Sequence, residues 1–112
     1  MENEEHVIYP ESIQEGLVVI KKGMTALSGK WSFIVLSELR SGVKRFNELR
    51  KILGISSKAL ADTLKNFELH GLVVRTVFPT KPVCVEYSLT EKGIDLDQVI
   101  IAMYNWSRKW LD

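Results

Sequence analysis

The sequence predicts a mainly α-helical single domain that contains one small β-hairpin. Three observations support this prediction. Apolar residues recur every three or four positions over most of the chain, as in helices that pack through one face. Between residues 72 and 89 the period falls to about two, which is typical of strands. The chain has only 112 residues, enough to bury one core but not two.

The first helix is expected over residues 11–28, after an N-terminal tail of residues 1–10. Its apolar positions begin with Ile13 and Leu17 and continue at three- and four-residue steps. A Ser-Gly pair interrupts this pattern, and residues 30–39 resume it. This second segment is rich in apolar residues and is expected to form a largely buried helix.

Residues 46–70 are expected to form two helices joined by a tight turn. The first is short and ends at Gly54, because glycine readily adopts the left-handed backbone that closes a helix. Ser56 or Ser57 can cap the second helix through its side-chain oxygen, and this helix extends to about His70. Two helices connected in this way by a turn that contains glycine form a helix-turn-helix.

Residues 72–89 are expected to form a hairpin, with its turn over residues 79–82. Thr90 then caps a last helix over residues 90–111. The hairpin follows the helix-turn-helix directly and so adds a wing to it. Residues 1–112 are therefore predicted to be one winged helix-turn-helix domain.

The net charge of +1 conceals a strongly basic middle. Residues 21–65 carry ten bases and three acids, whereas residues 1–20 carry five acids and no base. A localised basic surface is typical of proteins that bind nucleic acids or acidic proteins. Lysines and arginines that only solvate helices produce the same pattern, and charge alone does not separate the two interpretations.

Several classes of protein are not expected. No apolar run approaches the roughly 18 residues that cross a bilayer. The first five residues include three glutamates and no base, unlike a secretory signal, so a cytoplasmic protein is expected. The single cysteine and the isolated His6 and His70 do not indicate a disulfide or a metal site. Since no nucleophile and base are paired and no glycine-rich phosphate loop occurs, we expect neither enzymatic activity nor a cofactor.

Five short motifs occur along the chain in a fixed order. They are Gly29-Lys30-Trp31, Arg45-Phe46-Asn47-Glu48-Leu49, Gly54-Ile55-Ser56, Gly71-Leu72-Val73 and Val85-Glu86-Tyr87-Ser88-Leu89-Thr90. This series, over residues 16–110, resembles the HxlR family of bacterial winged-helix transcriptional regulators. The resemblance implies a DNA-binding homodimer of the broader MarR-like kind, whose N- and C-terminal helices pair the subunits. The chain departs from the family pattern at Ala61 and Thr63, so base preference does not transfer with the resemblance.

The second helix of the helix-turn-helix has two opposed faces at 100° per residue. Its apolar residues share one face and its charged residues share the other. We expect the charged face to enter the major groove of double-stranded DNA, where side chains from the first turns reach base edges. Asp62 has a second interpretation, an ion pair with Lys58 or Lys65 along the helix. The residues expected to contact DNA from this helix are Ser56, Ser57, Lys58, Ala61, Asp62 and Lys65.

A second group of residues is expected to hold the DNA backbone. The preceding turn and short helix cross the phosphates in this type of docking, so their cations position the protein without reading bases. Lys81, between two prolines at the tip of the wing, is expected to touch the minor groove or its phosphates, or else only to solubilise the turn. The backbone-contacting candidates in the turn and short helix are Lys44, Arg45, Asn47, Arg50 and Lys51.

The last helix is too apolar for the surface of one small domain, so a second copy is expected to cover it. An alternative is that its aromatic residues close the core of the monomer, and both can hold together. A twofold dimer would present two recognition helices to a near-palindromic site, with half-sites about 10 base pairs apart. The residues expected at the dimer interface are Ile13, Leu17, Val99, Met103, Tyr104, Trp106 and Trp110.

The input signal is the least defined feature. Many members of the family that this chain resembles sense oxidants through a cysteine near the start of the first helix, and residues 1–28 contain none. Cys84 is either an inert thiol or a redox sensor. Met103 and Trp106 line either a pocket for an unknown small-molecule effector or an ordinary core. The alternative to DNA regulation is a winged-helix protein interaction module without specific DNA binding.

Overall fold

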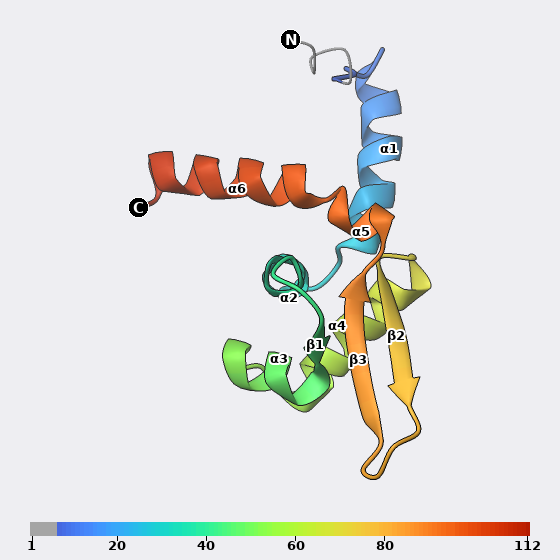
Figure 1. Ribbon diagram of the computed structural model, residues 1–112. Coiled ribbons are helices and arrows are strands. Elements are labelled where there is room, and N and C mark those ends of the chain that lie inside the picture. Colours follow the sequence, from blue (N-terminus) through green and yellow to red (C-terminus); the bar gives the residue numbers. More distant parts are fainter. Residues whose placement is uncertain (1–6) are drawn as a thin grey trace.

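The computed structural model describes residues 7–112 (Figure 1). The expected tail over residues 1–10 falls largely outside this range, as do His6 and the first glutamates. The predicted fold class is confirmed, since the chain is mainly helical with one small antiparallel sheet. The elements are α1 (Ile13–Ala26), α2 (Ser32–Leu39), β1 (Lys44–Arg45), α3 (Phe46–Leu53), α4 (Ser57–Leu69), β2 (Val73–Phe78), β3 (Cys84–Leu89), α5 (Glu91–Ile94) and α6 (Asp97–Trp110).

The sheet has three strands in the order β1-β3-β2, one more than the expected hairpin. Lys44 and Arg45 were expected in the turn and the start of the short helix; Arg45 does cap α3, but both residues also form a strand, β1. Both residues pair with β3, Lys44 opposite Tyr87 and Arg45 opposite Glu86. A two-residue strand is too short to show an alternating pattern, and its paired residues on β3 are 41 and 43 positions away in the sequence. Nothing local in the sequence could therefore indicate it.

The last helix is not continuous, which corrects the prediction of one helix over residues 90–111. As expected, Thr90 caps its start, and its side-chain oxygen accepts a hydrogen bond from the Gly93 amide at 3.1 Å. Gly93 packs so closely on the preceding segment that a Cβ there would lie 2.2 Å from the Leu72 carbonyl oxygen. The helix stops at Ile94, and α6 then starts at Asp97 in a new direction (Figure 1).

The core lies where α2, α3 and α4 meet the sheet. Its largest fully buried side chains include Leu36, Leu49, Leu60 and Phe67. Two predicted turn features are confirmed beside it. Gly54 ends α3 in the left-handed conformation with φ of 62°, and Ser56 caps α4 by accepting a hydrogen bond from the Ala59 amide at 3.1 Å.

We call α2, α3, α4 and the sheet, which enclose this core, the body of the domain. The two terminal helices, α1 and α6, project from the body (Figure 1). None of the residues of α6 is buried, and in α1 only Gly16 is. The radius of gyration is 16.1 Å, compared with about 13 Å for a compact domain of this length. An ion pair between Arg40, just after α2, and Asp97, the first residue of α6, joins α6 to the body. Within residues 7–112 no helix is both long and apolar enough to span a membrane.

Candidate nucleic-acid interface

The two opposed faces predicted for α4 are present. Leu60, Leu64 and Phe67 are buried against the rest of the body. Lys58 and Lys65 lie on the other side and are exposed. The body thus holds α4 along one side and leaves a charged side free to meet a partner.

The first turns of α4 hold most of the residues expected to touch bases. Ser57, Ala61 and Asp62 are exposed. The Ser56 oxygen already accepts the capping hydrogen bond, which leaves its hydroxyl hydrogen available to a phosphate. Thr63 is buried instead, and its hydroxyl donates to the Ala59 carbonyl at 2.8 Å. The departure from the family pattern at Thr63 therefore faces the core and not the free side.

Asp62 pairs with a neighbour on the same helix. Its carboxylate accepts a hydrogen bond from the Lys58 ammonium at 3.1 Å, which confirms one of the two interpretations of Asp62. The side chains are 87% and 67% exposed, so water screens the pair and it contributes little to stability. A weak pair of this kind can separate when either side chain meets a base or a phosphate.

The cations of β1 and α3 differ in how they are held. The Lys44 ammonium donates to the Ser41 hydroxyl at 2.9 Å, whereas Arg50 and Lys51 are exposed. Among the described residues, no carboxylate lies within ion-pair distance of Arg50 or Lys51. The Arg45 amide donates to the Glu48 carboxylate at 2.8 Å, so an acid occupies part of the start of α3, beside the Arg45 and Asn47 side chains expected to contact phosphates.

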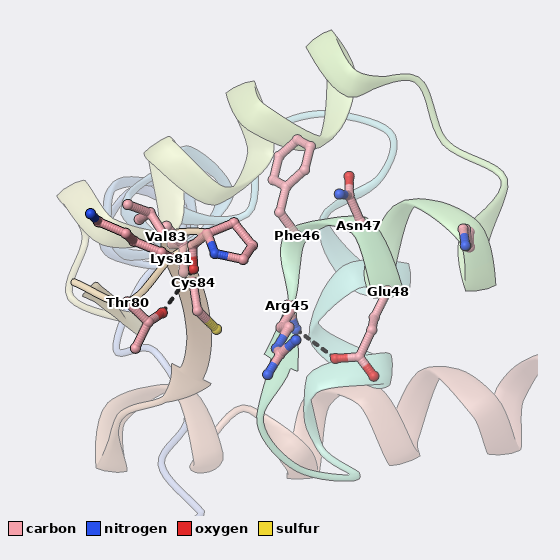
Figure 2. Close-up of a pocket in the computed structure, with 11 residues that line it drawn as sticks. Arg45, Phe46, Asn47, Glu48, Thr80, Lys81, Val83 and Cys84 are labelled. Atoms are coloured by element: carbon pink, nitrogen blue, oxygen red, sulfur yellow. Dashed lines mark hydrogen bonds between the residues drawn. The ribbon is translucent and has the colours of Figure 1, made fainter. Parts of the chain in front are cut away.

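An open groove of about 750 Å³ separates the start of α3 from the tip of the wing. Figure 2 shows Thr80 and Lys81 on the wing side of this groove and Arg45, Asn47 and Glu48 on the α3 side. Lys51 also lines it. The fold therefore brings together cations that are 30 or more positions apart in the sequence. Three cations around one open groove provide a surface that suits a phosphate backbone.

Arg75 is a further cationic candidate, which is not among the DNA-contacting residues predicted from the sequence. It is exposed on β2 and lines the same shallow hollow as Lys65 of α4. Its place could have been found from the alternation of β2, which puts it on the same face as Val73 and therefore beside the helices. The cationic surface of α4 thus continues onto the sheet.

Cys84 lies at the start of β3 and is half-buried. Its Sγ is 4.0 Å from a carboxylate oxygen of Glu86, and the Arg45 guanidinium lies 4.0 Å from the same oxygen. Figure 2 shows Sγ on the side of the wing that faces Arg45, a basic neighbour that sequence spacing did not reveal. A redox role for Cys84 stays a prediction. In the described part of the chain, no three His, Cys, Asp or Glu side chains gather as a metal site would require.

The residues expected at a dimer interface are exposed in the single chain. Trp106 is 57% exposed and Trp110 is 65% exposed, so neither closes the core of the monomer. Met103 is exposed as well, so an effector pocket between the first and last helices that Met103 and Trp106 would line stays a prediction. The remaining members of the set are also exposed: Ile13, Leu17, Val99 and Tyr104.

Comparison with known proteins identifies similar chains. The family model described as HxlR-like helix-turn-helix matches residues 26–112. YvaP of Bacillus subtilis (strain 168), an uncharacterized HTH-type transcriptional regulator, is 37% identical over 93 residues, which are 82% of this chain and 86% of that protein. A solved structure of the redox regulator HypR in its oxidized form has a TM-score of 0.77 and 35% identity, covering 84% of this chain and 98% of that chain. A MarR-family structure from Porphyromonas gingivalis W83 has a TM-score of 0.77 and 30% identity, covering 95% of this chain and all of that chain.

Proposed function

The chain belongs to the HxlR-like helix-turn-helix family of transcriptional regulators, and from this premise we propose that it binds a specific DNA operator as a homodimer. In each half-site, α4 lies in the major groove. The start of α3 and the wing hold the flanking phosphates. The protein regulates transcription by occupying this operator.

The observation that best supports this proposal is the free charged side of α4. A helix that is buried along Leu60, Leu64 and Phe67 is rigidly held, and its first turns are unobstructed. The major groove is wide enough to admit such a helix. Lys58 and Lys65 can donate to guanine acceptors or to phosphates, and Asp62 can accept from cytosine. Ser57 and Ala61 complete the surface in the groove.

The backbone contacts come from around α4. Arg45, Asn47, Arg50 and Lys51 extend from β1 and α3, and Lys81 reaches the duplex from the wing tip. Lys44 takes part from the strand that precedes α3. These groups approach phosphates, which carry no sequence information, so they set affinity and register.

The terminal helices support the homodimer. Large apolar side chains on α1 and α6 stay exposed in one chain, and contiguous exposed apolar surface marks an association site. Tryptophan and tyrosine bury much area at little entropic cost, so Tyr104, Trp106 and Trp110 are suited to the centre of the interface. A second copy is the proposed occupant because a symmetric regulator needs two recognition helices for a near-palindromic site.

Selection of genomic DNA fragments with the purified protein tests this function. We expect enrichment of fragments that share a near-palindromic sequence. Binding to the selected site should weaken by orders of magnitude between low and moderate salt, because several phosphates are neutralised. Equal affinity for all fragments would contradict sequence-specific regulation. Affinity that is insensitive to salt would favour the alternative, a protein interaction module.

A further inference from the structure

The side chain of Asn66 joins α4 to the end of α1. Its amide nitrogen lies 3.1 Å from the Ala26 carbonyl oxygen and 3.3 Å from the Thr25 carbonyl oxygen. The Ser28 hydroxyl lies 3.5 Å from the same nitrogen. These partners are about 40 positions away in the sequence. Asn66 therefore links a helix of the DNA-binding body directly to a terminal helix.

The link is placed where it can control the direction of α1. The last carbonyls of any helix lack partners within the helix, and α1 has no basic residue in its last turn. Asn66 supplies donors to two of these carbonyls. Only Ala26 and Leu27, at this same end, pack against the core of the body. Because the large apolar residues of α1 are exposed in the single chain, the apolar packing between α1 and the body in the described part of the chain is at this end of the helix.

We propose that Asn66 is a positioning residue that fixes the angle between α1 and α4, and with it the spacing of the two recognition helices. The inference rests on the proposed function, since it requires a dimer that pairs through its terminal helices. Asn66 itself need not touch DNA. It acts through α1, whose placement against the second copy determines where the partner's α4 lies.

The geometry makes the spacing sensitive to this angle. The 14 residues of α1 span about 21 Å. A tilt of roughly 10° about its anchored end moves the free end by about 4 Å over that length. Consecutive bases along one strand are about 3.4 Å apart. A modest loosening of the link therefore displaces the second recognition helix by about one base pair.

Spin labels on one chain measure the angle without DNA. The labels are placed at Gln14→Cys on α1 and Glu68→Cys on α4, in a Cys84→Ser background diluted with unlabelled protein. Both labelled positions are exposed. We expect a narrow distribution of distances that becomes about twofold broader with Asn66→Ala, because α1 then samples more orientations. Asn66→Asp keeps the shape of the side chain but replaces its donating amide with a carboxylate oxygen. It should broaden the distribution as much as Asn66→Ala does.

Gln98→Ala is the matched control. It also removes an amide that donates to a backbone carbonyl, but the carbonyl is that of Asp95, three positions away. The control should leave the distribution narrow. An equally narrow distribution in Asn66→Ala, with the protein folded, would overturn the proposal.

Operators with altered spacing give the second readout. On duplexes whose half-sites are moved one base pair closer or farther, the full-length protein should prefer the selected spacing. In Asn66→Ala we expect this preference to fall about fivefold, the scale of a lost hydrogen bond. A loss of affinity that is equal at all spacings would show a merely structural role and contradict the proposal. If the unsubstituted protein binds no duplex, the proposed function fails, whereas the spin-label distances still decide the role of Asn66 in holding α1.

Discussion

The body and the terminal helices use apolar residues in opposite ways. In α4 the residues Leu60, Leu64 and Phe67 are essentially inaccessible. In α1 and α6 the residues Leu17, Trp106 and others of similar size remain more than half exposed. The two regions have the same kinds of side chain on the same kind of helix. What differs is whether the chain supplies the surface that covers them.

This difference separates folding from assembly. Burial in the body contributes to stability within one chain, whereas in the proposed homodimer α1 and α6 are buried by a second chain, so their burial depends on protein concentration. The body also keeps its charged α4 side free. We infer that the body forms the DNA-reading unit by itself, while the terminal helices decide how two such units are spaced.

The largest expected effect is the loss of a core side chain. Phe67→Ala should lower the free energy of unfolding by about 3–5 kcal/mol, because it removes buried contacts and leaves a cavity. Urea denaturation measures this change, and it should be the same at low and high protein concentration. A cost below about 1 kcal/mol would contradict the assignment of Phe67 to the core of the body.

The next largest effect concerns assembly. Trp106→Glu places a charge in the proposed interface and should raise the dimer dissociation constant at least about 30-fold, as expected for an interface hot spot. Sedimentation velocity over a concentration series measures the constant. Val83→Glu is the control, since it adds the same charge to an exposed apolar residue of the wing. If the control weakens the dimer as much as Trp106→Glu does, the terminal helices are not the interface.

The features of the body that were predictable from sequence are those that depend on near neighbours. The period of three to four residues gave both faces of α4, and Gly54, Ser56 and Thr90 marked ends of helices correctly. Strand β1 was missed because its pairing with β3 depends on the assembled sheet. The link from Asn66 to Ala26 and the contact of Arg45 with Glu86 were missed for the same reason, since both join segments about 40 positions apart. The break between α5 and α6 was missed as well, because the apolar periodicity continues across it.

Two cations of the body should have different effects on DNA binding. Lys58→Ala should reduce discrimination between the selected site and altered sites by about tenfold, because Lys58 is proposed to meet bases. Arg50→Ala should weaken binding to all sites alike. It should also reduce the steepness of the plot of log affinity against log salt concentration by about one unit. Fluorescence anisotropy with a panel of duplexes measures both. Arg108→Ala, at the far end of α6, is a charge-matched control that should change neither property. Equal effects of Lys58→Ala and Arg50→Ala would contradict the assigned roles.

The smallest expected effect on stability is that of the exposed ion pair on α4. Asp62→Ala should change the free energy of unfolding by no more than about 0.5 kcal/mol, since water screens the pair with Lys58. Thermal denaturation measures this change. The same variant should still alter base preference at one position of the operator, which a binding panel detects. A large loss of stability would mean that Asp62 is structural and is not free to meet a base.

Hydroxyl-radical footprinting of the selected operator is the most direct test of a two-copy DNA reader. The account predicts two protected segments on one face of the duplex, about 10 base pairs apart from centre to centre, each covered by one chain. A single protected segment occupied by one chain, or no protection at concentrations where the protein is dimeric, would contradict it.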